Sequence, residues 1–328
     1  MAKKIVLGTR GSELARAQAH LVEKAIQAAH ADLKIETKII VTKGDKSGAI
    51  FQVADHEGPQ AANSPQDESA VADLRHGRKG LFTAEIERAL LAGDVDVAVH
   101  SAKDLPSETS PGAEIAAVLP RAATDDVLIS RHRGGLTALQ EGATIATGSV
   151  RRRHQLLWKR PNLKIVDLRG NVPTRLRKLA ENDWDAIVLA RAGLERLGLS
   201  PTQSEINFGD RKFFLEVLPR EIFLSAGGQG IIAMQIRADD ERIRGIIGLV
   251  NDRETLLCLR AEREFLRLLH GDCNSPVGVL ATERDGMMKL RGHLFDQRFG
   301  APREGEVEGE FEDGEGLAAQ LLRKINGE

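Results

Sequence analysis

The chain has 328 residues, of which 41% are hydrophobic and 29% charged, values typical of a soluble globular protein with room for two or three domains. A formal net charge of −2 argues against general affinity for nucleic acid or anionic lipid, and the lack of tyrosine argues against an aromatic-rich binding surface. Two cysteines, no secretory signal and no run of ~18 apolar residues lead us to expect a cytoplasmic protein without a membrane span.

The first eighty residues predict a strand, a helix and a second strand, followed by a long polar segment. An apolar run from Ile5 to Leu7 precedes the turn sequence GTRGS, and apolar positions at helical spacing begin after Ser12, a suitable N-cap. Residues 35–42 predict the second strand. Residues 43–78 show no sustained period, so we expect a long loop of the kind that forms lids or inserted segments.

The next segment combines a helix with a buried strand that ends in polar residues. Residues 83–93 predict the helix and residues 94–100 (DVDVAVH) the strand, which leads directly into HSAKDLP. Lys103 and Asp104 therefore follow the carboxyl end of a strand, where open α/β sheets bind ligands. A carboxylate at this place could steady a developing cation or move a proton. The alternative, a Lys103–Asp104 pair that only closes a turn, is equally compatible with these residues.

A second alternation of strands and helices follows. Strands are predicted at 126–130, 144–147, 164–168 and 185–190, with helices after Ser149, Val172 and Ala192. This pattern predicts a second α/β domain that faces the first across a cleft. A polar connection at 200–212 precedes residues 213–230, which we expect to lead back into the first domain.

From about residue 252 the pattern changes to that of a small α+β domain. One long helix is followed by HGDCNSP, a hairpin around ERDG and a final helix at 315–325. Cys258 lies among leucines at helical spacing and is expected to be an inert packing residue. Cys273 lies instead in the polar loop, where an accessible thiolate is a strong nucleophile, although an unreactive loop cysteine is the alternative.

Basic residues gather in the second unit. Residues 150–180 contain ten lysines or arginines and one acid, Asp167. Several arginines follow predicted strands directly, namely Arg10, Arg151, Arg152, Arg153 and Arg169. We expect these guanidinium groups, with that of Arg175, to meet at one cleft and bind a small polyanion by bidentate pairing. Surface arginines with no shared target are the alternative.

Three other chemistries have weaker support. Binding of a single nucleic-acid strand usually adds stacking aromatics to a basic groove, and only Trp158 lies within the basic segment. The GGQG sequence at 227–230 lacks the lysine and the spacing of a P-loop. His270 and Cys273 lack the spacing of a metal site, so we expect no metal.

The combination of motifs, in this order, resembles the porphobilinogen deaminase (hydroxymethylbilane synthase) family over nearly the whole chain. The motifs are TRGSELA, KGLFTAEIERALL, VAVHSAKDLP, TGSVRRRHQL, LRGNVPTRLRKL, AGLERLGL, GGQG and the cysteine loop. The resemblance implies a transferase of tetrapyrrole (haem and chlorophyll precursor) biosynthesis. Such an enzyme condenses four porphobilinogen molecules stepwise onto a dipyrromethane primer, with loss of ammonia, and releases hydroxymethylbilane by hydrolysis.

The resemblance also implies roles for individual residues. Cys273 would hold the dipyrromethane cofactor through a thioether, and Asp104 would be the catalytic carboxylate that stabilises a cationic azafulvene-like intermediate and the pyrrole nitrogens. The arginines are the counterpart of the acetate and propionate groups on every pyrrole. Besides Cys273, the residues matched to the cofactor are Ser101, Lys103, Thr147, Ser149, Arg151, Arg152, Arg175 and Gln229. Those matched to the substrate are Arg10, Ser12, Lys79, Phe82, Arg169 and Arg196.

The implied fold is α/β: two domains resembling periplasmic binding proteins that face a cleft, plus a small α+β C-terminal domain. We assign residues 1–120 and 222–248 to domain 1, which includes a mobile active-site loop at about 46–80. Residues 121–221 form domain 2 and residues 249–328 form domain 3. The expected partner is the small molecule porphobilinogen, with no nucleic acid and no membrane, and we expect a monomer.

Some positions depart from the family pattern. Asp272 precedes Cys273 where glycine is common, and its charge is expected to alter the loop or raise the thiol pKa. Gly148 replaces a common serine, and residues 120–130 lack the usual acidic-proline-arginine turn. The segments 46–78 and 200–212 look extended. These departures concern the lid and the hinge, not the reaction.

Two other functions stay open on the residues alone. Two α/β lobes around a cleft also describe solute receptors and the effector domains of transcription regulators. A receptor would carry an export signal and a regulator a helix-turn-helix segment, and we find neither. A cysteine hydrolase would pair Cys273 with a histidine, for which His270 and His100 are candidates.

Overall fold

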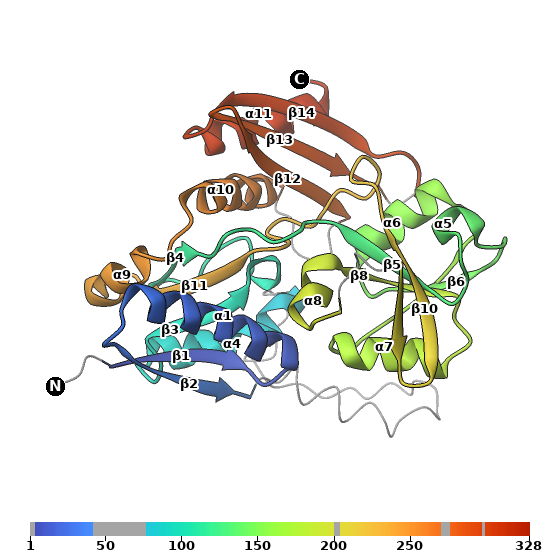
Figure 1. Cartoon of the computed structure of the whole chain (residues 1–328). Coiled ribbons are helices and arrows are strands. Elements are labelled where there is room, and N and C mark those ends of the chain that lie inside the picture. Colours follow the sequence, from blue (N-terminus) through green and yellow to red (C-terminus); the bar gives the residue numbers. More distant parts are fainter. Residues whose placement is uncertain (1–3, 42–76, 200–203, 270–275, 297–298) are drawn as a thin grey trace, which may run out of the picture.

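Three separate sheets organise the fold (Figure 1). The computed structural model describes residues 4–41, 77–199, 204–269, 276–296 and 299–328, with side chains from residue 83 onward in the second of these ranges. Within these ranges no helix has both the length and the apolar character needed to cross a membrane.

The first sheet has the strand order β2, β1, β3, β11, β4. Its parallel strands are β1 (Lys4–Arg10), β2 (Lys34–Ile40) and β3 (Val97–Ser101). β11 (Ile232–Arg237) lies antiparallel between β3 and β4 (Ala113–Val118), so the chain returns from the second sheet to the first. Helices α1 (Glu13–Ala29), α4 (Gly77–Leu91) and α9 (Glu241–Gly248) pack against this sheet.

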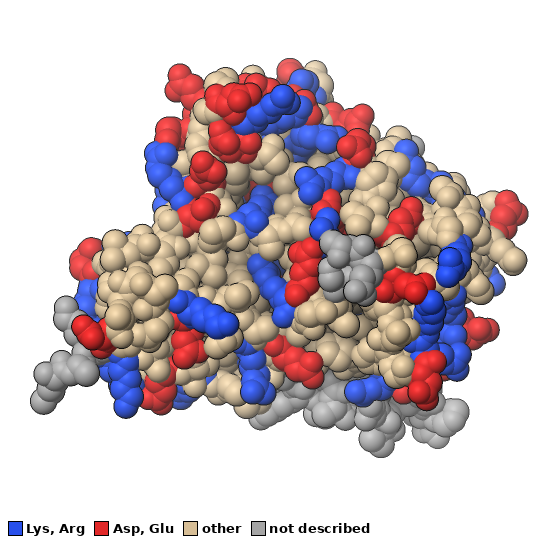
Figure 2. Space-filling model, viewed as in Figure 1, with Lys and Arg blue, Asp and Glu red and all other residues tan. Residues whose placement is uncertain are grey.

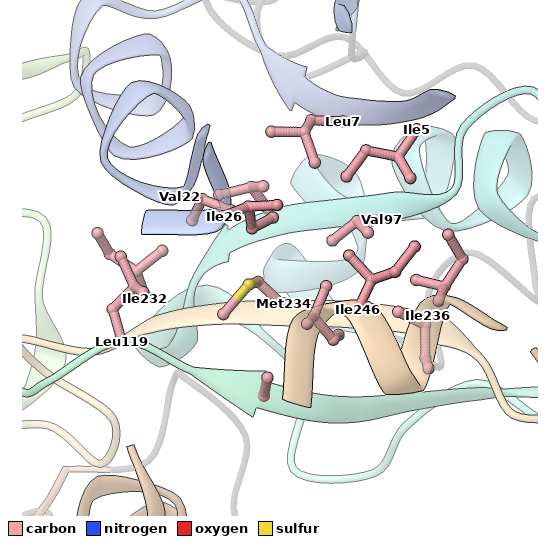
Figure 3. Packing of buried hydrophobic residues seen from close by; sticks show 14 of the residues in the cluster. Ile5, Leu7, Val22, Ile26, Val97, Leu119, Ile232, Met234, Ile236 and Ile246 are labelled. Carbon is pink, nitrogen blue, oxygen red and sulfur yellow. The ribbon is translucent and has the colours of Figure 1, made fainter. Parts of the chain in front are cut away.

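An aliphatic core holds the first sheet against its helices. Figure 3 shows Ile5 and Leu7 of β1 facing Val22 and Ile26 of α1, with Met234 of β11 beside them. All five side chains are fully buried, and burial of one such side chain stabilises the fold by about 1.5–3 kcal/mol. The core therefore fixes the carboxyl ends of β1 and β3, from which the site is built.

The second sheet has six strands in the order β7, β6, β8, β5, β10, β9. The strands are β5 (Asp126–Ser130), β6 (Thr144–Ala146), β7 (Lys164–Val166), β8 (Ala186–Ala190), β9 (Glu205–Phe208) and β10 (Arg211–Val217). Its helices are α5 (Gly135–Ala138), α6 (Val150–Lys159), α7 (Val172–Glu181) and α8 (Arg191–Arg196). Strands β6, β7 and β8 are parallel, and β5 runs antiparallel to β8 and β10.

The polar connection predicted at 200–212 is wrong from residue 205 onward. β9 and β10 form an antiparallel hairpin in which Phe213 pairs with Ile206, and both side chains are buried. β9 has only four residues, Glu205–Phe208, so the two-residue period of a half-buried strand is barely repeated within it. The first residues of the predicted connection, 200–203, lie outside the described residues.

The third sheet is the antiparallel β12 (Val277–Arg284), β13 (Met287–Leu294) and β14 (Arg303–Glu310), covered by α10 (Arg253–Leu268) and α11 (Gly314–Asn326). The predicted hairpin around ERDG is confirmed, with Asp285 and Gly286 both at positive φ, as a two-residue turn requires. Cys258 is buried in this core, and burial, with the charge of Glu262, raises its pKa to about 12, which confirms an inert packing residue. The three sheets confirm the predicted class of two α/β units and one α+β unit.

A buried carboxylate ties the third unit to the other two. Glu262 of α10 is fully buried and accepts two hydrogen bonds from the Arg121 guanidinium, at 2.6 and 3.2 Å. It also accepts from the backbone amides of Gly228 (2.6 Å) and Ala281 (2.8 Å). One side chain therefore connects three parts of the chain: Arg121, which lies between β4 of the first sheet and β5 of the second, the GGQG segment, and β12.

Candidate active site

The carboxyl ends of β1 and β3 line one pocket. Arg10 is the last residue of β1 and Ser101 the last of β3, and parallel neighbours end at the same edge of a sheet. The pocket has about 440 Å³ of open space, including its mouth. Its polar lining residues are Arg10, Ser12, Gln18, Thr83, His100, Ser101 and Asp104. Four site residues expected from the sequence therefore lie around one space.

Two residues of α1 shape this pocket. Ser12 is the N-cap, and its hydroxyl accepts from the Ala15 amide at 3.3 Å, as predicted. Gln18 is buried and hydrogen-bonds to the Ser101 hydroxyl at 2.8 Å. Gln18 was not predicted from the sequence. It lies midway between Leu14 and Val22 on the apolar face of a helix, and a polar residue in such a position indicates a buried hydrogen bond.

Lys103 and Asp104 lie in a single 3₁₀ turn, η1 (Ala102–Asp104), directly after β3. The Lys103 ammonium is 3.5 Å from Gln229 Oε1, and Gln229 Nε2 donates to Asp126 Oδ1 (3.0 Å). Gln229 therefore bridges η1 and the second sheet. Burial, with the charge of Arg152, lowers the pKa of Lys103 to about 8.

The GGQG segment has a backbone role beside this turn. Gly228 has φ +74°, and a Cβ there would lie 2.9 Å from the Lys103 amide nitrogen. Only glycine allows this conformation and this approach. The segment therefore presents Gln229 to Lys103 because Gly228 packs directly against η1.

Arg151 and Arg152, at the start of α6, are buried against a carboxylate that sequence reasoning missed. Arg151 lies 2.9 Å and Arg152 2.7 Å from the oxygens of Asp126, which is fully buried. Burial alone would raise the pKa of Asp126, but the two guanidinium charges hold it well below its usual range. Asp126 therefore takes up part of the charge of the two arginines that the family resemblance matches to the cofactor.

Further donors of the two arginines remain available. The Nε atoms of Arg151 and Arg152 are buried and have no hydrogen-bond partner among the described residues. On the face drawn in Figure 2, basic and acidic side chains are interspersed and form no continuous basic patch. Arg151 and Arg152 therefore belong to the interior of the site, not to a basic surface.

The polar residues before α6 have local partners. Ser149 is the N-cap of α6 and accepts from the Arg152 amide (3.4 Å), and buried Thr147 accepts from the Ser149 amide (3.2 Å). A Cβ on Gly148 would lie 2.6 Å from the Leu168 carbonyl oxygen. The loop before α7 therefore leaves no room for a side chain at position 148. This explains why glycine stands here where the family commonly has serine.

The remaining arginines divide between the site and other surfaces. Burial, with the charge of Arg152, lowers the pKa of Arg175 to about 10, and the charge of Asp104 opposes this, so the three groups are electrostatic neighbours. Arg169 is exposed and pairs with Asp167 at 2.8 Å. The expectation that Arg153 joins the cluster is wrong, because it is exposed and its guanidinium lies 5.6 Å from the Phe299 ring.

Arg196 links α8 to the GGQG segment. Its guanidinium donates to the Gly230 carbonyl at 2.7 Å, and burial lowers its pKa to about 10. This contact crosses between the second and the first sheet, at the residue that follows Gln229. Arg196 therefore lies at the junction of the two units and outside the set of residues that line the pocket.

Some expected site residues lie outside the described residues or side chains. Cys273, Asp272 and His270 fall in the range 270–275, and most of the expected loop at 46–80 falls in 42–76. Lys79 and Phe82 belong to α4, but their side chains are not described. The strand after the cysteine loop contacts the residues just before GGQG: the Val279 amide donates to the Ser225 carbonyl at 2.9 Å.

Together these features define a class of protein. One carboxylate, Asp104, lines the pocket of the first α/β unit and interacts electrostatically with basic side chains of both units, Lys103 and Arg175. The described residues contain no group of three histidine, cysteine or acidic side chains placed to hold a metal ion. This arrangement is that of an enzyme for a small, multiply charged anion.

The chain belongs to the porphobilinogen deaminase family. The family model described as Porphobilinogen deaminase, dipyromethane cofactor binding domain matches residues 5–245, and that described as Porphobilinogen deaminase, C-terminal domain matches residues 256–326. A porphobilinogen deaminase of Roseiflexus sp. (strain RS-1) is 39% identical over 99% of this chain and 96% of its own length. That of Syntrophomonas wolfei is 42% identical over 88% of this chain and 84% of its own length.

These matches confirm the predicted enzyme class, a transferase of tetrapyrrole biosynthesis with a dipyrromethane cofactor. Overlaps with solved structures are weaker. The methionine-binding protein MetQ is 15% identical with a TM-score of 0.41, covering 77% of this chain and 92% of its own. A Salmonella typhimurium periplasmic protein specific for arginine is 10% identical with a TM-score of 0.38, covering 78% and 94%. Scores this low add nothing to the family assignment.

Proposed function

We propose that this protein joins four porphobilinogen molecules to a dipyrromethane primer held by Cys273, with Asp104 as the catalytic carboxylate, and releases hydroxymethylbilane. The observation that carries the proposal is the position of Asp104 in a pocket beside Arg10, with Lys103 and Arg175 as charged neighbours. Each porphobilinogen brings an acetate and a propionate, so a growing chain needs cations on both sides of the cleft.

The described residues fit a dipyrromethane. Such a group carries carboxylates and no donor other than its pyrrole N–H groups, and the site offers unsatisfied buried donors in the Nε atoms of Arg151 and Arg152. Lys103 and Arg175 would add charge, and Asp104 would accept from pyrrole N–H groups. When bound, the dipyrromethane supplies the pyrrole carbon to which the first substrate is joined.

The strand that follows the cysteine loop supports Cys273 as the attachment point. A Cβ on Gly278 would lie 2.8 Å from the Leu224 carbonyl oxygen, and Arg151 donates to this same oxygen at 2.8 Å. Only five positions separate Gly278 from Cys273 in the sequence. Five residues of extended chain span at most about 18 Å, so the length of the chain allows a group tethered at residue 273 to reach the arginines of α6.

Asp104 would act on charge that develops in the substrate. The aminomethyl group of porphobilinogen arrives as an ammonium ion, and ammonia leaves with the bonding electron pair. The carbon left behind is cationic, and a carboxylate held in a pocket stabilises such a cation without having to reorganise. Asp104 is fixed for this task by its place in η1, between β3 and buried Leu105.

We also propose the finer assignments that the sequence suggests. The sheet topology supports domain limits at 1–120 with 222–248, 121–221 and 249–328, because β11 returns to the first sheet. The absence of a membrane-spanning helix among the described residues is compatible with a cytoplasmic enzyme, and we expect a monomer that binds neither nucleic acid nor membrane.

Incubation of the purified full-length protein with porphobilinogen tests the proposal. We expect four molecules of porphobilinogen to be consumed and four of ammonia released for each linear tetrapyrrole, measured by an ammonia assay and mass spectrometry. Cys273→Ala should produce no tetrapyrrole. Binding of porphobilinogen without ammonia release, as in a solute receptor, would overturn the proposal.

A further inference from the structure

A chain of buried polar side chains leads away from the pocket wall. His100, which lines the pocket, has Nε2 at 3.1 Å from Gln235 Oε1. Gln235 Nε2 donates to Glu87 Oε1 at 2.8 Å, and the Ser110 hydroxyl donates to Glu87 Oε2 at 2.7 Å. His100, Gln235 and Glu87 are 5%, 0% and 8% exposed, so these groups depend on one another for hydrogen bonds.

The direction of each hydrogen bond follows from the far end of the chain. The carboxylate of Glu87 can only accept, so Gln235 must turn its amide nitrogen toward it. The oxygen of Gln235 then faces His100 and can only accept, so the hydrogen of this bond must come from His100 Nε2. A neutral imidazole that carries its proton on Nε2 has an unprotonated Nδ1.

The surroundings also favour a neutral ring. Burial lowers the pKa of His100 to about 4, against the opposing charges of Glu87 and Asp104, and the charge of Arg10 lowers it further. An imidazolium at this position would place a fixed positive charge near Asp104. Such a charge would compete with a cationic substrate for the same carboxylate.

We propose that His100 is a positioning residue whose neutral, Nε2-protonated form is set by Gln235 and Glu87, so that the pocket wall offers an acceptor at Nδ1 and leaves Asp104 to the substrate. The expected effect on turnover rests on the proposed role of Asp104. The expected protonation state of the His100 ring is independent of that role, and it can be measured without any reaction.

The first experiment is ¹⁵N NMR of the histidine rings in the full-length protein at pH 7.5, with the His100 signals assigned by their loss in His100→Asn. We expect the Nε2–H tautomer alone. Glu87→Gln replaces an obligatory acceptor by an amide that can turn either way, so both tautomers of His100 should appear. Ser110→Ala is the matched control, because it removes a hydrogen bond from Glu87 but keeps the carboxylate, and it should leave the tautomer unchanged.

Kinetics then separate positioning from simple support of the fold. Glu87→Gln should lower kcat by roughly tenfold, about the worth of one hydrogen bond to a charged group, with little change in KM. Ser110→Ala should keep kcat within about twofold even if it melts at a lower temperature. If Glu87→Gln does not fold, Gln235→Met removes the acceptor of Nε2 and should mix the tautomers in the same way.

A wild-type ring that is protonated on Nδ1, or on both nitrogens, overturns the inference whatever the activity. Mixed tautomers in Glu87→Gln with unchanged kcat also overturn it, because the orientation of the ring would then not matter for turnover. Failure of Asp104→Asn to affect turnover would instead remove the proposed function and leave the assignment of the tautomer intact.

Discussion

Asp104→Asn should reduce turnover of porphobilinogen by about a hundredfold to a thousandfold. Asparagine keeps the size of the side chain but cannot stabilise a cation, and loss of a single fixed electrostatic partner of a transition state typically costs a factor of 10² to 10³. Asp104 is the only carboxylate among the residues that line the described pocket, so no neighbour there can replace it.

The measurement is ammonia release in a single turnover, with circular dichroism to verify the fold. Asp94→Asn is a suitable control, because Asp94 is exposed, precedes β3 and pairs only loosely with Lys38 at 3.8 Å. It should retain nearly full turnover. Turnover of Asp104→Asn within tenfold of the wild-type value would exclude Asp104 from the role proposed for it.

Asp126→Asn should lower the free energy of unfolding by about 3–5 kcal/mol, the usual cost of leaving buried charges without their partner. Two guanidinium groups, those of Arg151 and Arg152, would then be buried with no carboxylate. Because both arginines are matched to the cofactor, we also expect a smaller fraction of the purified protein to carry it.

The neighbouring Asp125 offers a matched comparison. Its partners are Arg220, at 2.5 Å, and Arg191, at 3.5 Å, which are 48% and 28% exposed and can turn to water when the carboxylate is removed. Denaturant unfolding at pH 7 should therefore show a loss of about 1 kcal/mol for Asp125→Asn. Equal losses for the two variants would contradict a special role for the buried pair.

The same carboxylate gives a dependence on pH with a defined sign. The pKa of Asp126 is depressed in the folded state, so its stabilising contribution is complete above the unfolded pKa of about 4 and is lost as the pH falls toward the folded value. The difference in stability between wild type and Asp126→Asn should therefore be constant from pH 7 to about pH 5 and shrink below about pH 4.

The sequence predicted those parts of the fold that show in local periodicity. β1, α1 and β3 have clear apolar patterns, and the residues that follow them gather because parallel strands end at one edge. β14 was not predicted, because only Val307 among its eight residues is buried and the strand reads as a charged segment. A half-exposed strand is defined by its partner, which the local sequence does not reveal.

The candidate site was predictable for residues that follow strands and much less so for their partners. Asp126 pairs with Arg152 across 26 positions, and nothing in either neighbourhood links the two. The GGQG segment lacks the features of a phosphate loop, and the close approach of Gly228 to η1 appears only in three dimensions. Burial of one arginine and exposure of the next, as for Arg152 and Arg153, depends on how α6 packs.

The central claim, a primer tethered at Cys273, is tested most directly by the intact mass of the protein purified from cells that make porphobilinogen. The wild-type chain should exceed the mass of its sequence by two linked pyrrole units. Cys258→Ser should keep this addition, because Cys258 is buried in the core of the third unit, and Cys273→Ser should lack it. A wild-type chain at the mass of its sequence, or an addition that survives in Cys273→Ser, would contradict the account.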